Sequence, residues 1–544
     1  MCKKEKKEGS VEERMKIGLF FSRSGGVTDR VVNLNSLAKH FSQNYYTFIV
    51  DDFFKTSGLE AMLGEIDKNA FDAVVLVGDS PLSYHNNKNA EFVVSQIEAR
   101  GINTNKIGFA NIKEQVALAH PSYPQKATEK AKVLVEVAIE KVKIAHPIKT
   151  REIAPHPAIA IIGATPGGML TAQRLLERNF KVYIIDRESQ YRTFTSKENQ
   201  DKIASVITFV EMHPRTNFLF NTKINDISGY AGRFYLNVTS GEETSNLVVG
   251  SIVVSNTTDR EFTNELRPLV HIDVNENGLF KPVNPDTLQV FTYEKGIFLL
   301  PDDESQELAN IVALSDSAAF AVTSFLERKD LGYNIVVSEI NEELCSGCGT
   351  CVKTCMFKAS SIDALKKVSV IDEQRCKGCG NCVTSCPTGA RDLLTYPQKY
   401  LTKAVELLSK FGDSTEPKVL AILCEGCGYT ALDLAGVHGL EYDVNVMPLG
   451  IRCGGTVDTQ LILEAFKQGF KGIVICKCGD SDCRNIVGNT DLDRRANLFR
   501  DVLRSRGIES DALLIVEGLR EGNNNCVHSI MNLYKDIMSK GGGN

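Results

Sequence analysis

The hydrophobic pattern near the amino terminus alternates between short apolar runs and longer amphipathic stretches. The runs at 17–21, 46–50 and 73–78 are apolar almost throughout, which is typical of strands buried on both faces of a parallel sheet. Stretches with helical spacing lie between and after them, at 58–68 and 91–100. This pattern predicts a parallel α/β domain.

A second α/β unit follows a linker. A long amphipathic stretch at 127–144 leads out of the first domain, and three prolines at 147, 155 and 157 mark the connection. The apolar runs 158–162 and 181–185 then predict two buried strands separated by a helix. Beyond 206 the pattern predicts short strands with turns, then a strand and a helix within 296–326.

The turn after the first strand of this unit is rich in glycine. Its sequence is Gly163-Ala164-Thr165-Pro166-Gly167-Gly168, and Thr165 stands where the G-x-G-x-x-G fingerprint has the glycine that touches a pyrophosphate. Asp186 ends the next strand, where an acidic residue holds the ribose. The candidate FAD-binding residues are Gly163, Gly167, Gly168 and Asp186. The pattern leaves two alternatives, a bound flavin and a Rossmann fold retained without its cofactor, and favours the second.

The carboxyl-terminal part repeats the α/β pattern. A helical connector at 397–411 precedes it. The predicted strands are 419–423, 472–475 and 513–516, and the predicted helices are 461–467, 493–504 and 527–538. This alternation predicts a third parallel sheet, so the chain is an α/β multidomain protein.

Length and charge narrow the class of protein. A chain of 544 residues and 59.9 kDa is too long to fold around a single hydrophobic core. Its length predicts three or four domains. Subtracting 68 acidic from 62 basic residues gives a net charge of −6, without a concentrated basic region, which argues against nucleic acid as a partner. The chain starts with charged residues, and its apolar runs are shorter than the ~20 residues of a membrane helix. We therefore expect a cytoplasmic protein without a membrane span.

The cysteines are concentrated in the second half of the chain. Of sixteen, only Cys2 precedes Cys345, and the last is Cys526. In a reducing compartment such clustering indicates metal or redox chemistry rather than a disulfide framework. The nine histidines form no metal-binding helical motif, and we find no catalytic residues.

Two cysteine runs have the spacing of bacterial ferredoxins, in which the fourth cysteine of each run binds the other cluster. We therefore expect two 4Fe-4S clusters and a path for single electrons. Structural zinc is the alternative, but it leaves the third cysteine of each run without a role. The expected ligands are Cys345, Cys348, Cys351 and Cys386 for the first cluster, and Cys376, Cys379, Cys382 and Cys355 for the second.

The carboxyl-terminal domain carries a third group of cysteines. Most of them stand at or just after the end of a predicted strand, and such loops converge at one edge of a parallel sheet. A shared metal centre is the favoured interpretation, with structural zinc or buried inert thiols as alternatives. These cysteines are Cys424, Cys427, Cys453, Cys476, Cys478 and Cys483.

These motifs resemble the A subunit of heterodisulfide reductase, continued by the hydrogenase delta (MvhD-like) iron–sulfur subunit. The amino-terminal resemblance lies in Ile17-Gly18-Leu19-Phe20, Gly25-Gly26 and the segments 110–115 and 127–132. The family expects cysteines where this chain has Ser22, Ser24 and Val116. The resemblance therefore implies that the family's amino-terminal cluster has been lost.

The Rossmann unit is similar to the flavin domain of the same family in the segments 227–234 and 296–299. Leu300-Pro301 replaces the small Ala-Gly pair of the family's second flavin contact, and a large part of the central flavoprotein region is missing. Both departures from the family pattern argue against bound FAD.

The last domain is similar to the delta subunit in Cys424-Glu425-Gly426-Cys427, in the segment 452–458 and in the segment 478–483. This resemblance implies a 2Fe-2S cluster that receives electrons from a hydrogenase or a formate dehydrogenase. Its four ligands would come from Cys424, Cys427, Cys453, Cys478 and Cys483. Cys476 is then left over, and we expect it to pack in the strand.

The expected domain order follows from these resemblances. Residues 1–150 form an amino-terminal α/β domain without its cysteines, and 151–335 a shortened Rossmann FAD/NAD(P)-binding-like domain. Residues 336–396 form a ferredoxin domain for two 4Fe-4S clusters, and 397–544 an MvhD-like 2Fe-2S domain.

The resulting hypothesis is a cytoplasmic electron-transfer subunit of a heterodisulfide-reductase-like complex in an anaerobe, with the two-electron chemistry on a partner. Its expected partners are other subunits of that complex, including an intact flavin-bearing A-type paralogue, and a hydrogenase or formate dehydrogenase as donor. One alternative is an FAD-containing electron-bifurcating subunit, and another resembles the B subunit of a quinone-interacting membrane-bound oxidoreductase. A third alternative is a cluster-bearing scaffold or redox sensor.

Overall fold

The structure is a computed structural model that describes most of residues 15–541. The charged amino-terminal segment with Cys2 and the tail at 542–544 lie outside the described residues. Also outside are 86–87, 153, 195, 256–258, 284–288, 302–306, 329–331, 335–336, 414, 480–482, 484, 486, 508–509 and 519–524.

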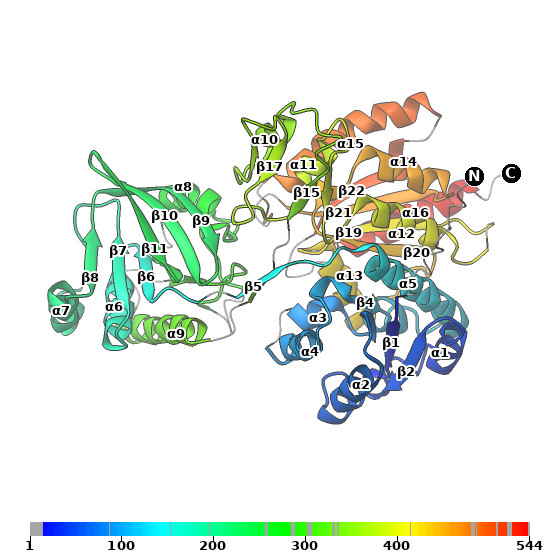
Figure 1. The fold of residues 1–544 in the computed structure, drawn as a ribbon, viewed down its shortest axis with the longest axis horizontal. Helices are drawn as coiled ribbons and strands as arrows, with labels where there is room; N and C mark the ends of the chain where they lie inside the picture. Colours follow the sequence, from blue (N-terminus) through cyan, green and yellow to red (C-terminus); the bar gives the residue numbers. More distant parts are fainter. Residues whose placement is uncertain are drawn as a thin grey trace, which may run out of the picture.

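The amino-terminal domain has a four-stranded parallel sheet in the order β2-β1-β3-β4 (Figure 1). The predicted strands are confirmed as β1 (Ile17–Ser22), β2 (Tyr46–Val50) and β3 (Ala73–Gly78), and β4 (Ile107–Asn111) is an addition. The helices are α1 (Leu34–Phe41), α2 (Thr56–Asn69), α3 (Pro81–His85), α4 (Lys88–Glu98) and α5 (Pro124–Ile144). A short turn of π-helix, η3 (Lys113–Ala117), follows β4.

The second unit has a five-stranded parallel sheet in the order β13-β12-β6-β7-β8. Numbered within the unit and read from the other edge this is 3-2-1-4-5, the Rossmann order without its sixth strand. Its strands are β6 (Ala158–Ile162), β7 (Lys181–Ile185), β8 (Thr216–Leu219), β12 (Ser251–Val254) and β13 (Ile297–Leu299). Its helices are α6 (Pro166–Glu177), α7 (Lys197–Met212), α8 (Arg260–Val270) and α9 (Leu308–Leu326).

A separate antiparallel sheet packs against this Rossmann sheet. It consists of β9 (Thr222–Tyr230), β10 (Arg233–Ser240) and β11 (Glu243–Val249), in the order β11-β10-β9. Short strands were predicted from residue 206 onward, and that start is wrong, because residues up to Met212 belong to α7. A second sheet here agrees with the short alternating stretches in the sequence.

Helix α9 is long and apolar enough, by length and composition, to cross a membrane, and no other helix in the described part of the chain meets that test. Its residues were expected to form an ordinary helix within 296–326. Its buried side packs against α6, where Ser315 Oγ donates to Gly167 O at 3.1 Å. The helix is therefore part of a folded core in this structure.

The ferredoxin-like module consists of short elements. Strands β15 (Ser338–Ile340) and β18 (Arg391–Leu393) pair with each other, as do β16 (Ser360–Ile362) and β17 (Ser369–Ile371), all antiparallel. The helices α10 (Thr350–Thr354) and α11 (Asn381–Thr384) follow the C-x-x-C parts of the two runs. The pair β5 (Thr150–Glu152) and β14 (Gly332–Asn334) lies where the chain enters and leaves the Rossmann unit (Figure 1).

The carboxyl-terminal domain has a parallel sheet in the order β20-β19-β21-β22. Its elements are β19 (Val419–Cys424), β20 (Val446–Ile451), β21 (Gly472–Cys478), β22 (Leu513–Gly518), α13 (Gly428–Val437), α14 (Thr459–Lys467), α15 (Gly488–Ser505) and α16 (Asn525–Gly541), preceded by the connector α12 (Gln398–Ser409). The sequence analysis missed β20, which contains Pro448. A proline is tolerated there because β20 is the edge strand.

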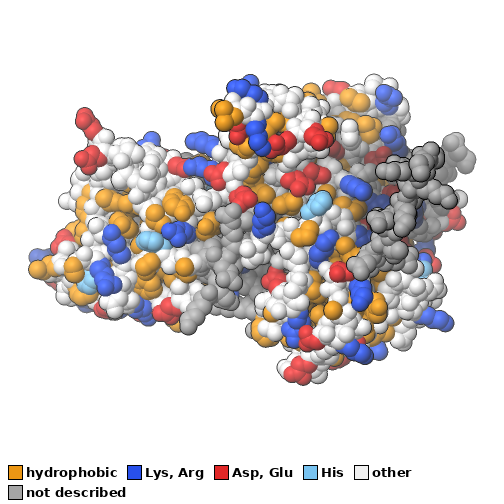
Figure 2. All heavy atoms as spheres, viewed as in Figure 1, with side chains coloured by type: hydrophobic (Ala, Val, Ile, Leu, Met, Phe, Trp, Pro, Cys, Tyr) orange, Lys and Arg blue, Asp and Glu red, His pale blue; other side chains and the backbone are white. Residues whose placement is uncertain are grey.

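The first and last domains share one hydrophobic core, which also includes residues of the ferredoxin module. Helices α5 and α12 pack together at this junction. The Rossmann unit forms a separate lobe with its own cores (Figure 1). Ion pairs connect it to the ferredoxin module, from Arg375 to Asp226 at 2.6 Å and from Lys377 to Glu294 at 3.4 Å. Figure 2 shows acidic and basic side chains interspersed over one face, in line with the small net charge.

Candidate metal centres

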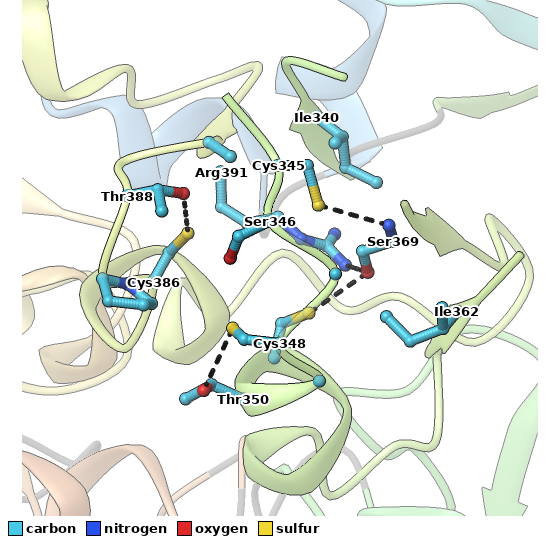
Figure 3. Close-up of a pocket in the computed structure, with 15 residues that line it drawn as sticks. Ile340, Cys345, Ser346, Cys348, Thr350, Ile362, Ser369, Cys386, Thr388 and Arg391 are labelled. Atoms are coloured by element: carbon cyan, nitrogen blue, oxygen red, sulfur yellow. Dashed lines mark hydrogen bonds between the residues drawn. The ribbon is translucent and has the colours of Figure 1, made fainter. Parts of the chain in front are cut away.

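The first cavity of the ferredoxin module is lined by Cys345, Cys348, Cys351 and Cys386 (Figure 3). Three of them come from the loop before α10 and from α10 itself, and Cys386 comes from the end of the second run. The amide of Ser369 donates to Cys345 Sγ at 3.4 Å. The structure thus brings together the four cysteines expected to hold the first cluster.

The second cavity is lined by Cys376, Cys379, Cys382 and Cys355. Burial raises the pKa of the Cys382 thiol to about 11, with Arg391 acting in the opposite direction. Burial likewise raises the pKa of Cys379 well above its usual range. Four converging thiols in one pocket form a soft donor set that fits iron, because metal binding compensates for burying thiolates.

Glycines shape both runs. Each C-x-x-C turn is followed by a glycine with a left-handed backbone, Gly349 at φ 73° and Gly380 at φ 84°. Each stands just before a short helix that carries the third cysteine of its run. A side chain with Cβ would be strained at these two positions, so the glycines allow the turns that bring the thiols together.

A third group of thiols lies at the carboxyl edge of the last sheet. Cys424, Cys427 and Cys478 are buried, with their sulfurs within 4.8 Å of one another. Cys453 adjoins Cys424, and hydrogen bonds from the thiols of Cys427, Cys453 and Cys478 hold the pKa of Cys424 well below its usual range.

Cys483 completes this group, and hydrogen bonding to Cys453 lowers its pKa to about 7. The structure therefore gathers all five cysteines expected at this centre, and they fit a thiolate-ligated metal cluster. Cys424 and Cys427 lie at the end of β19 and the start of α13, and Cys478 ends β21. The strand-end argument made from the sequence predicts this convergence correctly.

The second cavity adjoins this five-thiol group through the loop after Cys453. A Cβ added at Gly455 would stand 2.7 Å from Cys379 O, and Thr384 Oγ1 donates to Gly455 O at 3.1 Å. On the other side of the loop, Gly455 N donates to Cys453 Sγ at 3.4 Å. Two thiol groups far apart in the sequence are thus connected by one short loop.

Cys476 has a partner that the sequence analysis did not foresee. It forms a disulfide with Cys526 of α16, and both residues are completely buried. The expectation that Cys476 merely packs in its strand is therefore incomplete. The two cysteines are 50 residues apart, so their spacing alone did not suggest the pair. Cys476 follows the predicted strand 472–475 and Cys526 precedes the predicted helix 527–538, and no local signal in the sequence pairs them.

The polar side chains at the glycine-rich turn of the Rossmann unit are hydrogen bonded within the protein. Thr165 Oγ1 accepts from Gly168 N at 3.0 Å and is hydrogen bonded to the Ser255 hydroxyl, so the side chain closes the start of α6. Asp186 accepts from Ala164 N at 2.6 Å and from Glu188 N at 2.9 Å, which engages both carboxylate oxygens.

The other expected flavin contacts of this turn are structural. Gly163 adopts φ 111°, and Gly167 and Gly168 are buried in the first turn of α6. Leu300, which replaces a small residue of the resembled family, is completely buried. The residues of this turn are buried or hydrogen bonded to one another, which favours a Rossmann fold retained without its cofactor.

At the amino-terminal positions where the resembled family has cysteines, this chain has residues that hydrogen bond or pack within the protein. Ser24 Oγ donates to Asp79 Oδ2 at 3.1 Å and lies 3.4 Å from Ser22 Oγ, while Val116 is buried in the shared core. The same edge of the sheet receives Asp433 of α13, which accepts from Asn111 Nδ2 at 2.9 Å. This edge is therefore a junction with the last domain.

Comparisons with known proteins agree with this arrangement. Residues 419–541 match the family of the methyl-viologen-reducing hydrogenase delta subunit, and residues 344–390 match the 4Fe-4S dicluster domain. The A subunit of the ferredoxin:CoB-CoM heterodisulfide reductase of Methanosarcina mazei is 30% identical over 235 residues, which are 43% of this chain and 29% of that protein. The iron-sulfur protein VhcD of the F420-non-reducing hydrogenase of Methanococcus voltae is 32% identical over 102 residues, 19% of this chain and 71% of that protein.

The fold and the thiol groups define a mixed α/β iron–sulfur protein with a 4Fe-4S dicluster domain. Through its carboxyl-terminal domain, the chain belongs to the hydrogenase delta iron–sulfur subunit family. It joins this domain to a part similar to the A subunit of heterodisulfide reductase, and it spans about a third of the length of the A subunits it matches.

Proposed function

We propose that this chain is an iron–sulfur electron-transfer subunit of a heterodisulfide-reductase-like complex. The observation that carries the proposal is the loop at Gly455, which touches Cys379 of the second cavity and donates to Cys453 of the five-thiol group. When bound, 4Fe-4S and 2Fe-2S clusters supply one-electron transfer. The contact gives this chemistry a short path through the protein.

The proposed ligands are those expected from the sequence. Cys345, Cys348, Cys351 and Cys386 hold one 4Fe-4S cluster, and Cys376, Cys379, Cys382 and Cys355 hold the other. Four of Cys424, Cys427, Cys453, Cys478 and Cys483 hold a 2Fe-2S cluster. The shared cavities and the buried sulfur group support these three sets.

The arrangement of the cavities suggests the order in which electrons pass through the three centres. The second cavity lies against the Cys453 loop, and the first cavity contains the exposed Cys348. Leu344, beside Cys345 of the first cavity, is also exposed. Electrons therefore move between the delta-type centre and the second cavity, then to the first, where a partner subunit exchanges them.

The domain boundaries, the cellular location and the partner proteins are part of the same proposal. The chain has four domains, at 1–150, 151–335, 336–396 and 397–544, and works in the cytoplasm of an anaerobe with a hydrogenase or formate dehydrogenase as donor. An A-type paralogue that binds flavin, or another subunit of the complex, supplies the two-electron chemistry. The closed turn at Thr165 favours this division over an FAD-containing bifurcating subunit.

The test is anaerobic purification followed by analysis of iron, acid-labile sulfide and flavin. The proposal predicts about ten irons per chain, the sum of one 2Fe-2S and two 4Fe-4S clusters, without flavin. Serine variants of each of the five delta-type cysteines then identify the four ligands, because only those four abolish the 2Fe-2S signal. About three bound zinc ions in place of iron would contradict the proposal, and clusters that transfer no electrons to any low-potential acceptor would favour the scaffold or sensor.

A further inference from the structure

A buried arginine lies between the two cavities of the ferredoxin module. Arg391 belongs to β18, pairs with Ile340 of β15, and is only 3% exposed. Its side chain lines the first cavity, and Figure 3 shows the guanidinium among Cys345, Ser369 and Cys348. It also lies near enough to the second cavity to act electrostatically on Cys376 and Cys382.

The guanidinium is only partly satisfied by the protein. Nη2 donates to Ser369 Oγ at 2.5 Å and to Ser360 Oγ at 3.2 Å, whereas Nε and Nη1 have no hydrogen-bond partner among the described residues. A buried cation with free donors is costly unless an anion compensates for the lost hydration. The side chains around it supply serine hydroxyls and cysteine sulfurs.

The internal repeat has a different residue at the position equivalent to this arginine. The residue after C-x-x-x-Ala is Ser360 in the first run and Arg391 in the second. Ser360 lines the second cavity, and the hydrogen bond from Arg391 joins these two equivalent positions. The same backbone position therefore accepts a small hydroxyl in one half of the module and a cation in the other.

We propose that Arg391 is a positioning residue that places a fixed positive charge and the N–H donors of Nε and Nη1 beside the sulfur ligands of the first cavity, raising the reduction potential of the centre held there. The proposal rests on the proposed function. A one-electron reduction adds one negative charge, and a nearby guanidinium stabilises it without a proton. Hydrogen bonds to sulfur and net charge are the protein's means of setting such potentials.

The first variant is Arg391→Gln in the full chain, purified anaerobically and titrated redox-potentiometrically with EPR detection. We expect at least one 4Fe-4S centre to become at least tenfold harder to reduce, a shift of 59 mV for one electron. Lys366→Gln is the matched control, because it removes an exposed cation from the same module, ion-paired to Glu342 at 2.9 Å. We expect no shift in the control, since solvent screens its charge.

The variant Arg391→Lys keeps the positive charge, so it distinguishes a loss of charge from a failure to fold or to bind iron. If Arg391→Gln loses iron, the lysine variant should keep eight irons in the ferredoxin module and a midpoint closer to the native value. Midpoints in Arg391→Gln equal to those of the Lys366→Gln control would overturn the inference. So would iron-loaded Arg391→Lys that is tenfold harder to reduce. Native protein without 4Fe-4S clusters would instead refute the proposed function.

Discussion

Gly380 lies directly against Thr456. A Cβ added at Gly380 would stand 2.4 Å from Thr456 Cγ2, closer than real side-chain contacts allow, and 3.0 Å from its Cα. Gly380 follows Cys379 of the second cavity, and Thr456 ends the loop that starts at Cys453. The glycine thus permits the close approach of two thiol groups that belong to different domains.

Replacing this glycine is expected to separate the two groups without removing a ligand. Gly380→Ala should keep its iron but slow electron transfer between the delta-type centre and the ferredoxin module, because the loop must move away. The left-handed backbone adds a cost of about 1 kcal/mol. Stopped-flow reduction of the clusters, together with iron analysis, measures the effect.

Gly349→Ala is the matched control for that variant. Gly349 occupies the equivalent position of the first run with φ 73°, but nothing lies within 4 Å of a Cβ added there. It should show the same backbone cost and an unchanged transfer rate. Equal rates in the two variants would show that the Gly380 contact is not part of the electron path.

The Cys476–Cys526 pair is expected to act on stability and not on metal content. Cys526→Ala should lower the free energy of unfolding of the oxidised protein by about 2–4 kcal/mol, because the crosslink constrains the unfolded chain. Denaturant unfolding with and without a strong thiol reductant checks this, and reduced native protein should unfold like the variant. Loss of iron from Cys526→Ala, to the degree seen with Cys424→Ser, would place Cys526 in the metal centre instead.

Asp433 predicts a dependence of stability on pH. Burial, assisted by the charge of Glu114 and opposed by the hydrogen bond from Ser80, raises the pKa of its carboxyl to about 8. The folded protein therefore holds a proton that the unfolded chain releases near pH 4. Stability is highest below that pH, falls as the pH rises towards 8, and is constant above it; between pH 6 and 8 the loss is at most about 3 kcal/mol.

Asp433→Asn should remove this slope. Oδ1 of Asp433 accepts from Asn111 and Gln115, which an asparagine oxygen also does, and Oδ2 faces the Ser80 hydroxyl, which an amide can donate to. We expect the variant to lose the part of the slope between pH 6 and pH 8 that Asp433 contributes, with Glu60→Gln on the exposed side of α2 retaining the native slope. A native slope in Asp433→Asn would assign the pH dependence to another group.

The sequence predicted the parallel sheets well because their strands are buried on both faces and read as continuous apolar runs. Ala73–Gly78 and Ala158–Ile162 are buried along their whole length and have the predicted bounds. Strands β4 and β20 were missed because glycine, asparagine or proline interrupts their apolar runs. Local pattern does not reveal that Pro448 sits on an edge strand, since edge position depends on pairing.

The thiol groups were predictable where spacing or strand ends determine them. Both ferredoxin sets came from their C-x-x-C spacing, and the delta-type group from its strand ends. The Cys476–Cys526 disulfide and the contact of Gly455 with Cys379 depend on how distant segments pack, which a single sequence does not encode in any local pattern. No motif in the sequence marks Arg391, and its burial becomes evident only from the fold.

The turn at Thr165 leads to the last prediction. Thr165 caps α6 through its bond with Gly168 N, so Thr165→Ala should lower stability by about 1 kcal/mol, in the range of other lost helix caps. Thr171→Ala on the same helix is the control, because its buried hydroxyl has no partner among the described residues and its removal should cost less. Both variants should keep the iron content of the native protein and contain no flavin. If the native chain instead released one flavin per chain, and Thr165→Ala bound it more tightly, the turn would be a cofactor site that opens around its threonine.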